Sequence, residues 1–206
     1  MIGIVDYGMG NLLSVYNAFD YLGEDVFICK NPEDLSKVDR IVIPGVGAFK
    51  DCINRLRETG FQEALNDHVL VQAKPTLGIC LGMQVMGKVS YEFGEFEGLG
   101  WFDGEVVKID VGSTGLNLPN IGWNEINFLK TSSIFNKIPN HSDFYLVHSY
   151  FMDCKNKEDI IATYPYAGND ITAAICKNNI LAAQFHPEKS QDHGLRLLEN
   201  FIDWRP

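Results

Sequence analysis

Basic residues are scarce in this 206-residue sequence: 17 Lys and Arg stand against 27 Asp and Glu, and the formal net charge is −10. No run of Lys or Arg occurs anywhere in the chain. Because the phosphate backbone of a nucleic acid repels an acidic surface, a nucleic-acid partner would require a basic patch that this sequence does not contain. We therefore expect no nucleic-acid-binding function.

Long apolar runs are absent as well. No stretch reaches the roughly 18 apolar residues of a membrane-spanning helix, and the first segment meets a carboxylate at Asp6 before a signal-like stretch can form. The five cysteines are odd in number and include no C-x-x-C pair of the kind found in zinc sites and redox centres. The sequence thus predicts a cytoplasmic protein with no targeting segment, no membrane association and no metal.

The order of apolar runs predicts an α/β fold. Residues 2–5, 26–29, 40–43 and 75–79 form apolar runs that alternate with segments of helical periodicity. Such alternation is typical of a mostly parallel central sheet flanked by helices. From about residue 104 the pattern changes to β-rich segments, which predict a small antiparallel extension, and a last helix is expected at residues 191–204. The expected β-rich segments are residues 105–111, 125–128, 144–147, 160–164, 171–176 and 180–184. The length favours one domain over residues 1–206.

The strongest local motif is Gly78-Ile79-Cys80-Leu81-Gly82, which follows an apolar strand and precedes a helical segment. This pattern is typical of a nucleophile elbow, in which glycines leave room for a sharp, strained turn at the central residue. Such a turn would expose the Cys80 sulfur at the carboxyl edge of the sheet, and the helix N-terminus would favour the thiolate. The alternative is a structural cysteine in a Gly-rich turn.

A second motif, Gln184 to Ser190, follows the last apolar strand and contains His186 and Glu188 with a proline between them. Proline holds the backbone rigid, so the two side chains can reach the same side. A carboxylate beside an imidazole sets its tautomer and stabilises the imidazolium that forms when the ring takes a proton from a thiol. The alternative is an incidental ion pair at the end of a surface strand. Together with Cys80, the pair favours a Cys-His-Glu triad.

Two Gly-rich loops have different interpretations. The segment from Pro44 to Gly47 directly follows a strand, and its small residues leave backbone N–H groups free to stabilise an oxyanion. A plain strand-to-helix turn is the alternative for that segment. The loop from Gly8 to Gly10 lacks the third glycine of a dinucleotide fingerprint, because Leu13 stands in its place. We therefore expect no nicotinamide or flavin cofactor.

These motifs resemble those of the triad-type (class I) glutamine amidotransferases, through GICLGMQ at residues 78–84 and FHPE at 185–188. Further segments are similar to one branch of that family, the glutaminase subunits of imidazole glycerol phosphate synthases. They are DYGMGNL (6–12), PGVGA (44–48), GLG (98–100), LP (118–119), IGWN (121–124), VHSY (147–150) and residues 184–190. The resemblance covers essentially the whole chain, with the motifs in the right order.

The resemblance implies the flavodoxin-like class I fold, no cofactor, and hydrolysis of L-glutamine to glutamate and ammonia. Cys80 would attack the side-chain amide carbon, His186 would move the proton, and Glu188 would orient His186. The oxyanion donors would be the Leu81 N–H and a backbone N–H at Val46-Gly47. The residues that would hold the two ends of glutamine are Gln84, Glu92, His148, Ser149 and Tyr150.

The resemblance also implies a partner, a (β/α)₈ cyclase subunit that uses the ammonia to make imidazole glycerol phosphate and an aminoimidazole carboxamide ribotide in L-histidine biosynthesis. The two chains would form a heterodimer, and the glutaminase would be nearly inactive alone until the Val46-Gly47 peptide reorients. The residues expected near the cyclase and the ammonia entrance are Asn11, Asn120, Trp123 and Lys189. For Trp123 the alternative is an aromatic core residue.

Two departures from the family pattern concern the partner. Leu13 stands where the family usually has a basic or polar residue, and Asn120 stands where it usually has His. These departures leave open a paralogous glutaminase that feeds ammonia to a sugar amidotransferase in surface-polysaccharide biosynthesis. A second alternative is a non-catalytic partner subunit, which the intact triad disfavours, and a third is a cysteine peptidase on a similar elbow fold.

Overall fold

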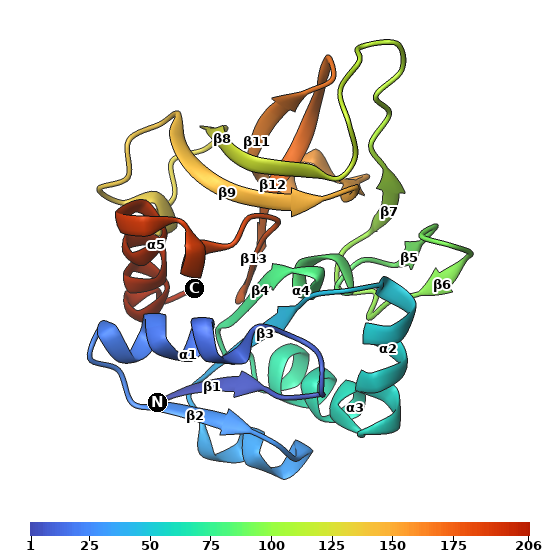
Figure 1. The fold of residues 1–206 in the computed structure, drawn as a ribbon. Helices are drawn as coiled ribbons and strands as arrows, with labels where there is room; N and C mark the ends of the chain where they lie inside the picture. The colour runs from blue at the N-terminus through green and yellow to red at the C-terminus, as the bar shows by residue number, and fades with distance from the viewer.

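Nine strands form the central sheet of the computed structural model, which describes residues 1–206 (Figure 1). In spatial order they are β2 (Val26–Cys29), β1 (Ile2–Val5), β3 (Arg40–Gly45), β4 (Thr76–Cys80), β13 (Ile180–Ala183), β12 (Asn169–Lys177), β11 (Ile160–Tyr166), β8 (Asn120–Phe128) and β9 (Ser142–His148). The strands from β2 to β13 are parallel, and those from β12 to β9 continue the sheet with antiparallel pairing. The predicted α/β fold is confirmed, and its antiparallel part is joined to the parallel strands in one mixed sheet.

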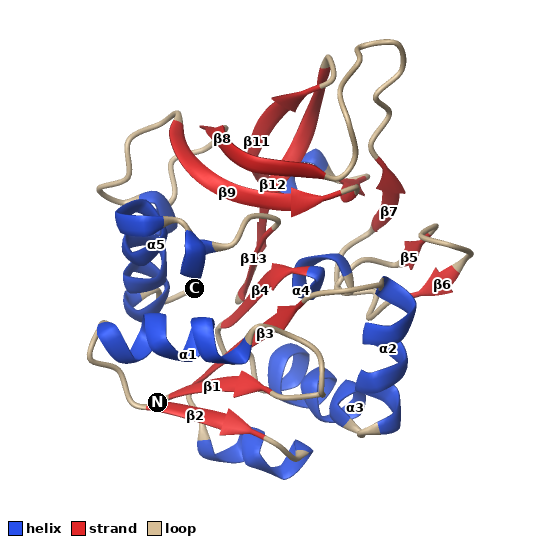
Figure 2. Cartoon of the chain, viewed as in Figure 1, coloured by secondary structure: helices blue, strands red, loops and turns tan.

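Helices cover both faces of the parallel strands (Figure 2). Helices α1 (Leu12–Tyr21) and α5 (Gln191–Asp203) pack in one core, while α2 (Phe49–Glu58) and α3 (Phe61–Leu65) pack in the other. Successive residues of a strand pack into opposite cores: in β1, Ile4 packs in the first core and Val5 in the second. Because both faces are covered, these strands are continuous apolar runs in the sequence.

A second, four-stranded sheet borders the main one (Figure 1). Its order is β10 (Tyr150–Cys154), β7 (Gly104–Lys108), β5 (Val89–Ser90) and β6 (Phe96–Glu97). The remaining elements are short: α4 (Leu81–Gln84), a π-helical turn η2 (Asn66–Val71) and the 3₁₀ turns η1 (Pro32–Lys37), η3 (Ser133–Phe135), η4 (Lys157–Asp159) and η5 (Pro187–Lys189). No helix has both the length and the apolar character needed to cross a membrane.

Strand β8 begins well before the predicted start at residue 125. It pairs in register with β9 from Asn120 opposite His148 to Ile126 opposite Ser142. The early part of β8 is rich in Gly and Asn, which are poor strand formers, so only the partner strand makes it extended. The middle of β9 also lies beside the segment after β13, because the His186 N–H donates to the Tyr145 carbonyl at 2.9 Å.

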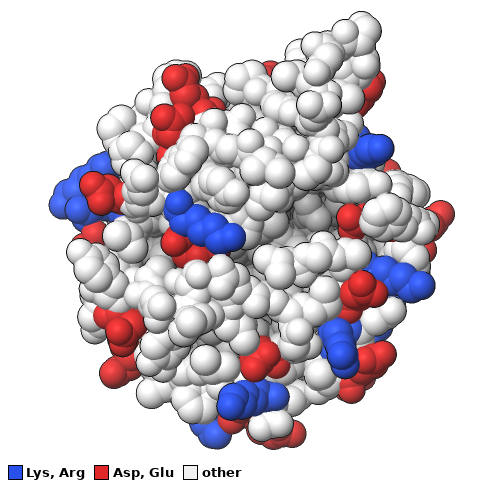
Figure 3. All heavy atoms as spheres, viewed as in Figure 1, with Lys and Arg blue, Asp and Glu red and all other residues white.

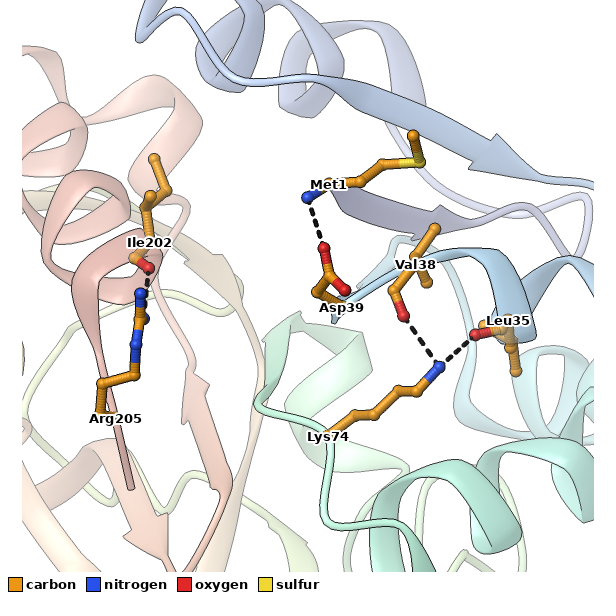
Figure 4. A network of polar contacts seen from close by, with 7 residues as sticks. All are labelled: Met1, Leu35, Val38, Asp39, Lys74, Ile202 and Arg205. Carbon is orange, nitrogen blue, oxygen red and sulfur yellow. Dashed lines mark hydrogen bonds and ion pairs between the residues drawn. The ribbon is translucent and has the colours of Figure 1, made fainter.

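Polar contacts tie the chain together at the opposite edge, near the amino ends of the parallel strands (Figure 4). The N-terminal ammonium of Met1 lies 2.8 Å from an Asp39 carboxylate oxygen. Lys74 Nζ donates hydrogen bonds to the backbone carbonyls of Leu35 and Val38, at 2.6 and 2.8 Å. These contacts join the segments before β3 and β4.

On the face shown in Figure 3, acidic and basic side chains are scattered and no basic cluster forms.

Candidate active site

Cys80 lies where β4 ends and α4 begins. Its backbone has φ 55° and ψ −110°, a conformation that residues other than glycine rarely adopt. A Cβ at Gly82 would lie 1.9 Å from the Ile43 carbonyl oxygen, and one at Gly78 would lie 2.6 Å from the Met86 side chain. At Gly82 only glycine therefore lets the chain turn this close to the β3 backbone, whereas at Gly78 the Met86 side chain would have to move, and the expected elbow geometry is present.

The other four cysteines differ from Cys80 in their surroundings. Burial raises the pKa of Cys29 and Cys176 to about 11 and that of Cys52 and Cys154 to about 12. Their thiols are therefore protonated at neutral pH and are poor nucleophiles. Cys80 alone among the five lines a cavity at the carboxyl edge of the sheet.

His186 and Glu188 form a buried pair directly after β13. His186 Nδ1 lies 2.8 Å from Glu188 Oε1, and the two side chains are 2% and 1% exposed. Burial lowers the pKa of the His186 imidazole, but interactions with Cys80 and Glu188 outweigh burial and raise this pKa above its ordinary value. The other ring nitrogen, Nε2, is buried and has no hydrogen-bond partner. It is therefore available to exchange a proton with a group that enters the cavity.

Cys80 and His186 line the same cavity, which has a volume of about 310 Å³. Every residue that the sequence predicts for the oxyanion hole and for glutamine also lines it, whereas Glu188 lies behind His186. The lining residues are Val46, Gly47, Cys80, Leu81, Gln84, Glu92, Phe93, Pro119, Val147, His148, Ser149, Tyr150 and His186. The structure therefore brings together motifs from the whole length of the chain.

The turn after β3 forms one wall of this cavity. Gly47 has φ +100°, and the neighbouring Val46 side chain is 39% exposed. The buried Tyr7 hydroxyl donates a hydrogen bond of 2.6 Å to the Pro44 carbonyl. Pro44 belongs to β3, so the end of the strand is anchored just before the turn, while Gly47 gives the peptide beyond Val46 the conformational freedom to reorient.

Glu92 lies at the wall of the cavity and at the N-terminus of α2. Its Oε2 accepts a 2.7 Å hydrogen bond from the Phe49 backbone N–H. The next residue, Phe93, has φ 56°, is 84% exposed and lies 6.4 Å from the Tyr150 ring, measured between ring centroids. Phe93 could not be recognised from the sequence, because a single exposed aromatic residue in a loop forms no pattern.

His148 lines the cavity, but both of its ring nitrogens are already engaged inside the protein. Nδ1 lies 2.8 Å from the Tyr150 carbonyl oxygen, and Nε2 lies 2.7 Å from the Tyr164 hydroxyl. Burial lowers the pKa of His148 to about 4, so the ring is neutral at physiological pH. The ring therefore has no free nitrogen for a ligand, and His148 faces the cavity beside Ser149 and Tyr150 without a free side-chain donor or acceptor.

Asn120, which the resemblance places near the cyclase and the ammonia entrance, has an inward-facing side chain. Its side chain is 6% exposed, and its Nδ2 donates a hydrogen bond of 3.2 Å to the Tyr164 hydroxyl. The side chain is therefore buried beneath the surface of β8, and its expected place near the ammonia entrance stays a prediction. The physical reason is the alternation along β8, which directs Asn120 inward while its neighbour Ile121 is 62% exposed.

Two of the other residues expected at the ammonia entrance, Trp123 and Lys189, lie around Tyr145, a residue that no sequence motif indicated. Trp123 is 46% exposed and packs edge-on against the Tyr145 ring at 6.0 Å, so it is a surface residue rather than part of the core. Lys189 Nζ lies 5.8 Å from the same ring, and the His186 ring lies 6.4 Å from it. Asn11, at the start of α1, does not line the cavity.

The chain belongs to the class-I glutamine amidotransferase family, because its residues 3–204 match that family's sequence profile. A crystal structure of a glutamine amidotransferase has the same fold, with a TM-score of 0.76 and 16% identity over 98% of this chain and 97% of that one. The structure of PurLQS from Thermotoga maritima is equally similar, with a TM-score of 0.76 and 15% identity over the same shares of the two chains.

Within this family the chain is similar over its full length to HisH subunits of imidazole glycerol phosphate synthase. Subunit HisH 1 of Campylobacter jejuni (strain RM1221) is 50% identical over 202 residues, which cover 98% of this chain and 99% of that protein. Subunit HisH of Chlorobaculum tepidum is 42% identical over 204 residues, which cover 99% and 100%. The branch that the sequence motifs indicate is therefore confirmed.

Proposed function

We propose that this chain, as one domain over residues 1–206, is the glutaminase subunit of an imidazole glycerol phosphate synthase. It hydrolyses L-glutamine to glutamate and ammonia and passes the ammonia to a cyclase subunit in histidine biosynthesis. The observation that carries the proposal is a single cavity lined by Cys80 and by His186, whose Nε2 is free and whose Nδ1 is held by Glu188. Full-length similarity to HisH subunits supports the pathway.

In the first half of the reaction, the Cys80 thiolate attacks the side-chain amide carbon of glutamine. The carbonyl oxygen takes the negative charge, and the backbone N–H groups of Leu81 and of the Val46-Gly47 turn stabilise it. His186 then donates its Nε2 proton to the nitrogen, the C–N bond breaks, and ammonia leaves a thioester on Cys80. Glu188 stabilises the imidazolium throughout, because its carboxylate faces Nδ1.

In the second half, a water molecule attacks the thioester while His186 Nε2 takes one of its protons. The C–S bond breaks, glutamate is released, and the Cys80–His186 pair returns to its starting state. The hydrogen bonds of Gln84 indicate how the substrate is oriented. Its Nε2 donates to the Tyr150 carbonyl at 2.8 Å and to Gln184 Oε1 at 3.0 Å, so only its Oε1 remains, as an acceptor suited to the α-ammonium of glutamine.

We place the cyclase over the exposed apolar residues of β8 and α1. Ile121 and Trp123 project from one face of β8 and are 62% and 46% exposed, while Leu13 of α1 is 68% exposed. Apolar side chains of this kind are stabilised when a partner covers them. This proposal includes the heterodimer and a cytoplasmic location, which suits a nucleophilic thiol and four further free cysteines.

The test is glutamate formation by the purified chain with and without a histidine-pathway cyclase. We expect low turnover alone, a strong increase with the cyclase, and a loss of at least about 10³-fold in Cys80→Ala, since the covalent step then has no nucleophile. Cys176→Ala is the matched control and should retain turnover, because Cys176 lies in β12 away from the cavity. Full stimulated turnover in Cys80→Ala would refute the mechanism.

A pull-down followed by mass spectrometry tests the pathway. Recovery of a (β/α)₈ cyclase supports the histidine assignment, whereas recovery of a sugar-modifying amidotransferase in its place would overturn it and leave the glutaminase chemistry intact.

A further inference from the structure

Gln184 has no role in the reaction described above, although its side chain reaches the nucleophile. It follows β13 directly and is 0% exposed. Its Nε2 lies 3.7 Å from Cys80 Sγ, within hydrogen-bond range for a sulfur acceptor. A buried amide beside a reactive sulfur can either donate to it through the nitrogen or repel its charge through the oxygen. The consequence depends on which end of the amide faces Cys80.

The neighbouring groups determine that orientation. Gln184 Oε1 accepts a 3.0 Å hydrogen bond from Gln84 Nε2, and the same Gln84 nitrogen donates to the Tyr150 carbonyl at 2.8 Å. If the Gln84 amide were reversed, its oxygen would face the Tyr150 carbonyl, which can only accept. Gln84 therefore presents N–H to Gln184, Gln184 presents its oxygen to Gln84, and its own N–H groups face Cys80.

The next contacts hold the Tyr150 carbonyl in the same way. A carbonyl only accepts, so the neutral His148 ring, which has one N–H, must donate from Nδ1 to Tyr150. His148 Nε2 is then an acceptor and receives the Tyr164 O–H at 2.7 Å. The Tyr164 oxygen in turn accepts from Asn120 Nδ2 at 3.2 Å. In every hydrogen bond of this buried network, the donor and the acceptor are therefore determined.

We propose that Gln184 is a positioning residue for Cys80. The Gln184 side-chain N–H, oriented by the network of hydrogen bonds from Asn120 to Gln84, holds the thiolate sulfur of Cys80 and stabilises it. This inference rests on the proposed function, since it assigns Cys80 the role of nucleophile. A hydrogen bond to a charged acceptor is stronger than one to a neutral group, so Gln184 favours the thiolate over the thiol. The donor is preorganised because each amide in the chain is held by its neighbour.

The test measures Cys80 itself in the full chain, before any turnover is assayed. The rate of Cys80 alkylation by iodoacetamide is followed by mass spectrometry between pH 5 and pH 10 in wild type, Gln184→Met and Tyr164→Phe. Gln184→Met keeps the length of the side chain and removes the donor, so we expect the alkylation profile to shift, with a rate about tenfold lower at pH 7. Glutamine turnover in the complex should fall about tenfold in kcat, and KM should change less, because Gln84 is still held by the Tyr150 carbonyl.

Tyr164→Phe keeps the ring and removes the O–H that holds His148, so the same shift is expected at a smaller size, about threefold in kcat. It also keeps the inference testable if Gln184→Met does not fold. A role limited to packing would lower stability without moving the alkylation profile, and that result in the folded variants would overturn the inference. Failure of the proposed function is a different result, namely turnover retained in Cys80→Ala.

Discussion

The two edges of the parallel strands are built in opposite ways. At the carboxyl edge, Cys80 has a strained backbone, and His186 Nε2 and Glu188 Oε2 are buried atoms without a partner. At the amino edge, Met1 pairs with Asp39, Lys74 donates to two backbone carbonyls, and Arg40 donates to the Trp204 carbonyl, although Arg40 Nη1 is also a buried atom without a partner. The reactive groups at the carboxyl edge are strained or unpaired, which lowers the stability of that edge. Polar contacts at the amino edge hold the strands together.

The largest expected effect concerns the elbow. In Gly82→Ala the added Cβ would lie 1.9 Å from the Ile43 carbonyl oxygen, a backbone atom that cannot move without separating β3 from α4. We expect a loss of at least about 3 kcal/mol in unfolding free energy and loss of glutamine turnover. Denaturant unfolding and the glutaminase assay measure the two effects.

Gly23→Ala is the control at the other edge of the fold. Gly23 also has a positive φ, +82°, but an added Cβ meets no atom within 4 Å. It should lower stability by about 1 kcal/mol through backbone strain alone and leave turnover intact. Equal losses in the two variants would remove the contrast between the edges.

The second effect is the acid sensitivity of the network behind the cavity. The pKa of His148 is lowered from 6.5 to about 4 in the folded chain, so below pH 6.5 the unfolded chain binds a proton that the folded chain does not. Stability from this group is therefore complete above pH 6.5 and is lost as the pH falls towards 4, by about 2 kcal/mol between pH 7 and pH 5.

The measurement is the difference in unfolding free energy between wild type and His148→Gln, which removes the titrating group. That difference should shrink by about 2 kcal/mol from pH 7 to pH 5. A difference that stays constant over this range would show that His148 is not held neutral by the fold.

The third effect isolates the backbone strain at the nucleophile. Cys80→Ala and Cys80→Gly both remove the sulfur, but only glycine is relaxed at φ 55° and ψ −110°. We expect the Gly variant to be more stable than the Ala variant by about 1 to 2 kcal/mol, the reverse of the usual order in a folded element. Thermal unfolding of the two inactive variants gives the comparison directly, and greater stability of the Ala variant would argue against strain.

The smallest effect is expected at the amino edge. Lys74→Met removes the two hydrogen bonds to the Leu35 and Val38 carbonyls, and we expect about 1 kcal/mol of lost stability with unchanged kcat. Lys30→Met is the matched control, since Lys30 is exposed and its ammonium makes no hydrogen bond. A change in kcat in Lys74→Met would contradict a purely stabilising role for this edge.

Much of the site could be predicted from local sequence. Glycines around Cys80 and the proline between His186 and Glu188 constrain their own backbone, and such signals need no distant partner. The position of Asn120 could not be predicted, since pairing with β9 decides which way each β8 residue points. Gln184 and Tyr145 were missed because a single polar or aromatic residue acquires meaning only from the groups packed around it.

The sequence by itself determined the family, the order of the elements in the parallel half, and which cysteine and which histidine stand at strand ends. These features depend on apolar runs, glycines and prolines, whose effects act over a few residues. The tertiary structure alone decided that the antiparallel strands extend the same sheet, that His148 is an internal partner, and that a chain of hydrogen bonds ends at Cys80. Pairing between segments about 30 to 100 residues apart creates these features, and no local pattern encodes a partner at that distance.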